Sequence, residues 1–308
     1  MSEQPTILVP VDYRPQSMAA YEYAKIVAEA TSCSLTLLYV IEEQGFFTKK
    51  ILNKEQRAAI IHKAESTLKE LIQNDKNLKV RGISAFPIIQ KGKVYQRIIK
   101  IAAEIKPKLI IMGRTDSSNF KKNIAGTNTH HIVREANTPV ITIKGCDEVT
   151  TTNHILLPLD LTHPVREKIA KAIEMAKFLD AKICVLAVLQ SNWLSKKIKF
   201  KKILNEIKRI FNKYNIECNT YLKITKKSPI SKIINDFALE IKADMIMLMT
   251  QQEMNIHEYF IGSTAQEIIN ESDLPVLTII PHPELKIDIK HHLFKALVDP
   301  MRIFGKLE

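Results

Sequence analysis

The chain opens with a short apolar run that ends in aspartate, TILVPVD at 6–12, and a similar run, HILLPLD, occurs at 154–160. After each run, apolar or small residues recur at positions i, i+3 and i+4, which is the spacing of an amphipathic helix. A second apolar run follows, SLTLLYVIEE at 34–43 or KICVLAVLQS at 182–191. Strands that are apolar along their whole length and alternate with helices predict a parallel sheet covered on both faces.

The same order of elements continues in both halves. A helix, a third strand, a helix, a fourth strand, a last helix and a fifth strand are expected in turn. Apart from the last helix, they are predicted near 52–74, 78–90, 94–105, 108–113 and 139–143, and again near 197–214, 216–225, 230–241, 244–249 and 275–279. This alternation predicts an α/β fold with two doubly wound parallel-sheet domains in tandem.

The two halves are also related residue by residue. Residues 98–143 align with 234–279 without a gap, with fourteen identities in forty-six positions. A repeat of this length indicates a duplicated domain rather than a solenoid, whose units run to roughly 20–50 residues. We therefore expect domains at 1–145 and 154–281, a polar linker at 146–153 and a C-terminal extension at 282–308.

Bulk composition is that of a soluble globular protein, with 45% hydrophobic and 25% charged residues. No apolar run reaches the roughly 18 residues that cross a bilayer, and no secretory signal opens the chain, so a cytoplasmic location is expected. The four cysteines form no CxxC pair, and we expect neither a metal site nor a disulfide framework.

The net charge of +12 is concentrated in one segment. Residues 191–232 hold twelve Lys or Arg against Glu206 and Glu217. Apolar residues recur there at helical spacing: Phe200, Ile203, Leu204, Ile207, Ile210, Phe211 and Tyr214. We therefore interpret the lysines as the solvated face of an amphipathic helix and favour this over a surface that binds lipid, RNA or an acidic protein. No nucleic-acid-binding signature supports a nucleic-acid partner.

Candidate chemistry lies where the predicted strands end. Asp12 follows the first strand, Val40 lies at the end of the second, and the fourth leads into Gly113-Arg-Thr-Asp116. Nine residues later Gly126-Thr127 opens a helix that leads to TPVITI; the second half closes with Gly262-Ser263 and LPVLTI. With these motifs, the chain resembles a tandem universal stress protein, a family whose nucleotide-binding members carry G-x2-G-x9-G-[S/T]. The resemblance covers roughly 6–145 and 154–281.

The resemblance implies an adenine nucleotide alpha hydrolase-like, Rossmann-like fold and a site for ATP or a related adenine nucleotide. Asp12 would accept a hydrogen bond from adenine and Val40 would line the base pocket. Gly113, Gly126 and Thr127 would face ribose and phosphates, with Met112 and Asn128 beside them. Such glycines let the backbone approach a phosphate, and a Gly-Thr at a helix start offers it N–H groups and a hydroxyl.

The sequence departs from this motif in both halves. Asp116 occupies the second glycine position, where a carboxylate repels phosphates unless a cation such as Mg²⁺ bridges them. Arg114 and Lys121 or Lys122 would offset that charge. In the second half Met249 and Gln252 replace both early glycines. We therefore expect the competent site in the first half and a closed or altered one in the second.

Some of these residues also have purely structural interpretations. Asp12 and Asp160 are suited to cap the helices that follow them. Gly126 and Gly262 fit a tight helix–strand packing. His130 and His131 are adjacent on one helix and therefore point in different directions, which disfavours a shared metal. We expect them to be surface histidines.

Three hypotheses about function follow. The first is a regulator whose bound nucleotide alters contacts with protein partners. The second is a ligand-free interaction module whose halves form an internal pseudo-dimer through their fifth strands, with a further homodimer as an option. The third and weakest is an enzyme, at most a slow ATPase or a protein that phosphorylates itself at Thr127 or Ser263. No P-loop, GxSxG or HExxH motif supports catalysis, so no catalytic residue is assigned.

Overall fold

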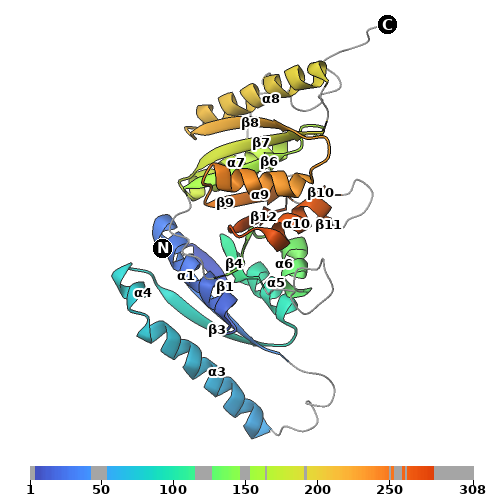
Figure 1. Ribbon diagram of the computed structural model, residues 1–308. Helices are drawn as coiled ribbons and strands as arrows, with labels where there is room; N and C mark the ends of the chain where they lie inside the picture. Colours follow the sequence, from blue (N-terminus) through green and yellow to red (C-terminus); the bar gives the residue numbers. More distant parts are fainter. Residues whose placement is uncertain are drawn as a thin grey trace. The chain divides into compact units, whose positions relative to one another are not determined.

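The chain divides into two compact units, Met1–Thr150 and Thr151–Glu308. The structure is a computed structural model that describes residues 4–42, 54–114, 127–145, 153–163, 165–190, 193–249, 251–252, 259–260 and 262–280 (Figure 1). The division falls inside the predicted linker, and the finer domain limits stay predictions.

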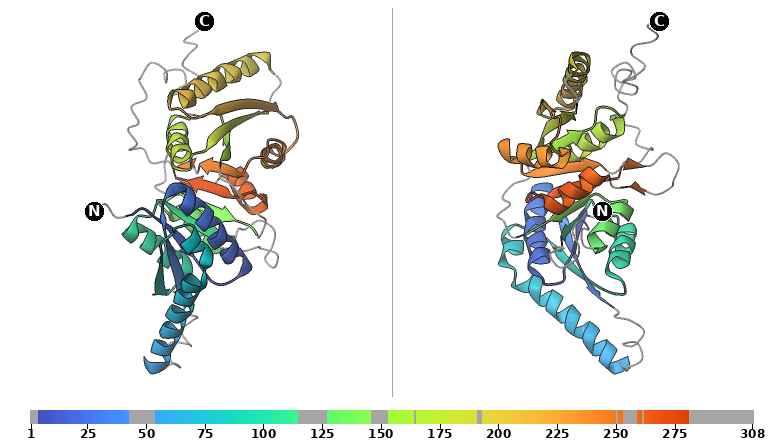
Figure 2. Two further views of the ribbon diagram at one scale, coloured as in Figure 1. Left: turned by 90° about the vertical axis from the view of Figure 1, so that its left-hand side faces the viewer. Right: turned by 45° about the vertical axis from the view of Figure 1, so that its right-hand side comes forward.

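Unit 1 is a five-stranded parallel sheet in the order β3-β2-β1-β4-β5. Its strands are β1 (Thr6–Pro10), β2 (Ser34–Ile41), β3 (Ala85–Lys91), β4 (Leu109–Gly113) and β5 (Val140–Ile143). Its helices are α1 (Pro15–Thr31), α3 (Lys54–Asn74), α4 (Lys76–Val80), α5 (Val94–Ile105) and α6 (Thr127–Glu135). The face of the sheet that α1 covers is opposite the one that α5 and α6 cover (Figure 2), as right-handed crossovers require.

Unit 2 repeats this topology in the order β12-β9-β6-β7-β8. Its strands are β6 (His154–Leu159), β7 (Lys182–Leu189), β8 (Cys218–Ile224), β9 (Met245–Met249) and β12 (Val276–Ile279). Its helices are α7 (Arg166–Phe178), α8 (Leu194–Lys213), α9 (Ile230–Glu240) and α10 (Ser263–Glu271). The predicted α/β fold class, with two doubly wound sheets, is confirmed.

Burial explains why the strands lack alternation. Ile7, Leu8 and Val9 of β1 are fully buried, because helices cover both faces of the sheet. The first helix of each unit also ends in the same way, with a residue in the left-handed conformation. Ser32 after α1 and Asp180 after α7 both adopt left-handed φ values, 54° and 50°, which end a helix sharply.

One local prediction was wrong. A strand was expected over 78–90, but α4 occupies Lys76–Val80 and β3 begins only at Ala85. The Asp75 side chain accepts a hydrogen bond from the Asn77 N–H at 2.9 Å, which caps the short helix. In unit 2, a short antiparallel pair, β10 (Gln251–Gln252) and β11 (Tyr259–Phe260), lies between β9 and α10 in the sequence.

The basic segment behaves as predicted. Six apolar residues of α8 are buried, namely Phe200, Ile203, Leu204, Ile207, Ile210 and Phe211. Lys201, Lys202 and Lys208 are exposed on the other side of the helix. Among the helices described, none is long and apolar enough to cross a membrane.

A buried ion pair ties the α3–α4 junction to α1. The Lys25 Nζ atom lies 2.7 Å from Asp75 Oδ2, and the Lys25 side chain is only 3% exposed. The Tyr21 hydroxyl donates to the same carboxylate oxygen at 2.8 Å. Burial alone would raise the pKa of Asp75, but the hydrogen bonds from Lys25 and Tyr21 outweigh it and hold that pKa below its usual range.

The cysteines that the structure describes are interior residues. Cys33, Cys184 and Cys218 are buried and free. Burial raises the pKa of Cys184 and of Cys218 to about 12. Within the described ranges, no group of three or more His, Cys, Asp or Glu side chains is placed to hold a metal.

Candidate functional site

In open parallel sheets, ligands bind beyond the carboxyl ends of the strands, where the strand order reverses direction. In unit 1 that point lies between β1 and β4, which are neighbours although β2 and β3 come between them in sequence. Asp12 follows β1 and Gly113 ends β4. The corresponding residues in unit 2 are Asp160, after β6, and Met249, which ends β9.

Asp12 organises the turn that leads into α1. Its Oδ1 atom accepts the Arg14 N–H at 3.0 Å, and the Arg14 Nε atom lies 3.5 Å from Oδ2. Tyr13, between them, takes a left-handed φ of 63°. The N-cap of α1 is Arg14, with no side-chain cap. Asp12 therefore shapes the turn before the helix and does not cap the helix itself.

Gly113 is held against the start of α1. A Cβ atom at this position would lie 2.3 Å from the Gln16 carbonyl oxygen and 2.7 Å from the Ser17 nitrogen. Both are backbone atoms, so no side-chain rotation would relieve the overlap. The Ser17 hydroxyl in turn accepts the Asp12 N–H at 3.2 Å. Asp12 and Gly113 thus both lie against the first turn of α1.

The other predicted residues are placed unequally. Val40 is half-buried near the end of β2, and Met112 is buried beside Gly113 in β4. Thr127 begins α6 and Asn128 follows it, half-buried. Two predicted residues, Asp116 and Gly126, lie outside the described residues, as do Lys121 and Lys122; Arg114 is buried.

Sequence reasoning missed an aromatic pair beside Asp12. The rings of Tyr13 and Tyr39 lie 5.5 Å apart at an angle of 44°. Tyr39 and Val40 are neighbours in β2, so their side chains point to opposite faces of the sheet. The only signal in the sequence was one tyrosine at the end of each of two adjacent predicted strands.

The two histidines of α6 belong to a separate cluster. The ring of His131 stacks on Tyr95 of α5 with centroids 4.2 Å apart, and its Nδ1 atom lies 2.9 Å from Glu135 Oε1. Burial, followed by the charges of Arg134 and His131, lowers the pKa of His130. These contacts join α5 to α6 and agree with the structural interpretation of the histidines.

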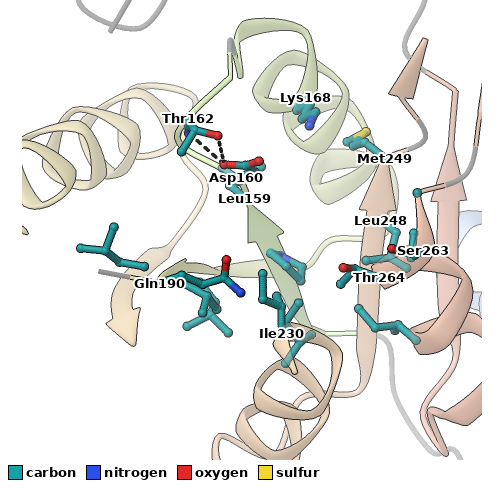
Figure 3. Close-up of a pocket in the computed structure, with 18 of the residues that line it drawn as sticks. Leu159, Asp160, Thr162, Lys168, Gln190, Ile230, Leu248, Met249, Ser263 and Thr264 are labelled. Carbon is teal, nitrogen blue, oxygen red and sulfur yellow. Dashed lines mark hydrogen bonds between the residues drawn. The ribbon is translucent and has the colours of Figure 1, made fainter. Parts of the chain in front are cut away.

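Unit 2 holds a cavity of about 520 Å³ at the equivalent position (Figure 3). Drug-sized ligands occupy pockets of roughly 300–1,000 Å³. Its polar lining comes from the ends of β6 and β7 and the starts of three helices: Asp160, Thr162, Lys168, Gln190, Lys196, Ser263 and Thr264. Its apolar lining includes Val188, Phe200, Ile230, Ile234 and Met249.

Asp160 repeats the turn made by Asp12 and adds further partners. Its Oδ1 atom accepts the Thr162 N–H at 2.9 Å and the Thr162 hydroxyl at 2.6 Å. The His163 Nδ1 atom lies 3.0 Å from Oδ2. Burial would raise the pKa of Asp160, but the hydrogen bonds from Thr162 and His163 outweigh it and lower that pKa. Asp160 is therefore an anionic acceptor whose orientation is fixed locally.

The lining of this cavity differs from the sequence expectation. Met249 and Gly262-Ser263 do lie at one site, but Met249 lines the cavity without closing it. The helices that follow the two aspartates also start differently. Helix α1 begins three residues after Asp12, whereas α7 begins at Arg166, six residues after Asp160.

Comparison with known proteins agrees with the fold. A model of the universal stress protein family matches residues 5–144 and again residues 151–279. The universal stress protein MJ0577 of Methanocaldococcus jannaschii is 26% identical in an alignment of 151 residues that covers 45% of this chain and 93% of that protein.

Solved structures that match over most of the chain share the fold. A universal stress protein from Archaeoglobus fulgidus has a TM-score of 0.69 at 20% identity, covering 91% of this chain and 98% of that one. The functionally unknown protein PA1789 of Pseudomonas aeruginosa has a TM-score of 0.65 at 20% identity, covering 91% and 93%. At this identity the likeness concerns the fold alone.

Proposed function

Because the chain belongs to the universal stress protein family and contains that domain twice, we propose that it is a regulator that binds an adenine nucleotide in unit 1. ATP or a close relative is the ligand, and Mg²⁺ accompanies its phosphates. In this proposal, the base lies against Asp12 and Val40, and the phosphates face Gly113, Gly126 and Thr127 with Met112 and Asn128 beside them.

One observation carries the proposal. Asp12, Gly113 and the first turn of α1 meet at the point where the strand order of unit 1 reverses. In doubly wound sheets this is the ligand-binding position. Thr127 begins α6, and free N–H groups at a helix start attract phosphate.

Mg²⁺ has a specific role in this hypothesis. Asp116 stands where the family motif has its second glycine, and its carboxylate would repel a phosphate group. A divalent cation bound by both would turn that repulsion into attraction. Nucleotide affinity in unit 1 is therefore expected to depend on Mg²⁺ more steeply than it would without Asp116.

The regulatory effect would be transmitted through the duplicated fold. We propose that the two units form an internal pseudo-dimer through β5 and β12, each four apolar or β-branched residues long. Nucleotide binding would then change how this pair contacts protein partners, or a second copy of the chain. The cytoplasm, where ATP is abundant, is the expected location.

A second candidate function is a ligand-free interaction module. The observation that favours it is that the functional-looking residues of unit 1 already have structural roles. Asp12 holds the turn to Arg14, and Gly113 makes room for the backbone of Gln16. A slow ATPase remains a third hypothesis, and it would gain support only if the protein released phosphate from ATP faster than a blank without protein.

Calorimetry with ATP separates the candidates. Thr127→Val removes the hydroxyl expected at the phosphates, and Ser263→Ala makes the matched change in unit 2. A hydrogen bond to a charged group contributes about 1.5–3 kcal/mol, so Thr127→Val should lower the affinity for ATP by about tenfold or more. Ser263→Ala should leave the affinity for ATP unchanged. No heat with any of the three proteins supports the interaction module instead. Equal loss in both variants would place the site elsewhere.

A further inference from the structure

The cavity of unit 2 is lined by a lysine whose counterpart in unit 1 is an alanine. Asp12 and Asp160 lie 148 residues apart, and so do the left-handed residues Ser32 and Asp180 that end the first helices. At this spacing Lys168 of α7 corresponds to Ala20 of α1. Ala20 is fully buried, whereas Lys168 lines the cavity. The two units therefore differ by a charge at the same position of the same site.

Lys168 is poorly compensated where it stands. Within the part of the chain that the structure describes, its ammonium group has no hydrogen bond or ion-pair partner. Burial lowers the pKa of Lys168, and the nearby Asp160 offsets this only in part. Both Asp160 oxygens are engaged by Thr162 and His163. A half-buried ammonium without a direct partner costs free energy, and an anion in the cavity would recover it.

A second group in the same cavity also favours an anion. Gly262 is the N-cap of α10, a helix of nine residues, and Ser263 and Thr264 in its first turn line the cavity. The N–H groups and dipole of a helix start attract negative charge. In Figure 3, Ser263 and Thr264 lie on the same side of the view as Lys168 and Met249.

Besides Asp160, Thr162, Gln190 and Lys196, the remaining lining is largely apolar. Val188, Phe200, Ile230 and Ile234 contribute to the wall, and Figure 3 shows Ile230 across the cavity from Lys168. A volume of about 520 Å³ is much larger than an inorganic anion needs. The cavity therefore suits a molecule with one charged end and an apolar remainder.

We propose that unit 2 carries its own binding site for a small organic anion, with one phosphate or carboxylate group held between Lys168 and the start of α10. The apolar part of the ligand lies against Val188, Ile230 and Ile234. Met249 forms part of the wall and takes the place of the glycine at which a phosphate chain would enter. This site needs no nucleotide in unit 1, so the duplicated chain combines two different ligand sites.

The test measures the reactivity of Lys168 itself. The full-length protein is treated with formaldehyde and cyanoborohydride, and methylation of each lysine is followed by mass spectrometry. The probes are inorganic phosphate, acetate and phenyl phosphate, with chloride used to keep the ionic strength constant. Lys171 is the matched control, because it lies on the same helix, pairs with Glu174 and does not line the cavity.

We expect phosphate or acetate at millimolar concentration to slow methylation of Lys168 at least threefold and to leave Lys171 unchanged. Whichever of the two protects better identifies the anionic group. Phenyl phosphate should act at about tenfold lower concentration than phosphate, because its ring buries apolar area worth ~1.4 kcal/mol. Unchanged methylation of Lys168 with all three probes, or equal slowing of Lys171, would overturn the proposal.

Variants provide a second readout. Phosphate should raise the melting temperature of the wild type and of Lys168→Arg, which keeps the charge, and of Lys171→Met. It should not raise that of Lys168→Met. A phosphate-induced shift that survives in Lys168→Met contradicts the assigned counter-ion. ATP titration of Lys168→Met tests unit 1 separately, so failure of this site is distinguishable from failure of the nucleotide proposal.

Discussion

Gly113 offers the sharpest test of how the site in unit 1 is built. In Gly113→Ala the new Cβ atom would lie 2.3 Å from the Gln16 carbonyl oxygen, 2.4 Å from the Gln16 carbonyl carbon and 2.7 Å from the Ser17 nitrogen. Because all three are backbone atoms, either the start of α1 or the end of β4 has to move. Overpacking of this kind costs about 1–3 kcal/mol, and the absence of a flexible neighbour places this case at the upper end.

A compensating gain is expected from the unfolded chain. Replacing glycine by alanine at an unstrained position stabilises a protein by about 0.4–1 kcal/mol. The net loss for Gly113→Ala is therefore about 2 kcal/mol, or a decrease of about 4–8 °C in melting temperature for a domain of this size. Gly145→Ala is the control, since a Cβ there meets nothing within 4 Å.

Urea unfolding followed by far-UV circular dichroism measures both variants. If Gly113→Ala is as stable as Gly145→Ala to within about 0.5 kcal/mol, a typical limit for neutral substitutions, the packing role assigned to Gly113 is wrong. Loss of ATP binding in a Gly113→Ala protein of unchanged stability would instead show that the glycine serves the ligand directly. The two roles thus predict different results in the same pair of experiments.

Three further predictions concern charge and burial. Asp75→Asn keeps the cap on α4 but leaves buried Lys25 without its main partner, so we expect a loss of about 3 kcal/mol in urea unfolding; a loss below 0.5 kcal/mol would contradict this. The pKa values of Asp75 and Asp160 are lower in the folded than in the unfolded protein, so the stability that these groups contribute is complete above about pH 4 and is lost as the pH falls. When the melting temperature is plotted against pH, Asp75→Asn should therefore show a smaller decrease at acid pH than the wild type. The thiols of Cys184 and Cys218, with pKa values near 12, should resist Ellman's reagent at pH 8 until the protein unfolds; rapid labelling of either in the native state would refute their burial.

Much of the fold was predictable because the hydrophobic pattern that indicates each strand or helix extends over the whole element. Strands buried on both faces, such as β1 and β6, read as continuous apolar runs, and the repeat gave each assignment a second, independent copy. The error at 78–90 has a local cause. Leu78 and Val80 read as part of a strand, but the Asp75 cap starts a helical turn that ends only at Val80.

The site was less predictable, because its geometry depends on contacts between distant segments. The motif singled out Gly113 as a ligand-site residue, which stays a prediction, but the sequence did not show that the backbone of Gln16 lies where a Cβ atom of residue 113 would be. Lys168 was overlooked for a related reason. On its own it is one lysine in the first turn of a helix, and it becomes informative only when paired with Ala20 of the other unit.

The two units differ both in where the first helix starts and in the residue that ends the fourth strand. In unit 1 the early start of α1 and the glycine at 113 require each other, because any side chain there would overlap the helix. In unit 2, α7 starts later after its aspartate, and Met249 stands where unit 1 has Gly113. A comparison of motifs position by position counts Met249 as the loss of a site. The structure instead places Met249 and Lys168 in the lining of one cavity, which is why the proposed anion site of unit 2 differs in kind from the nucleotide site proposed for unit 1.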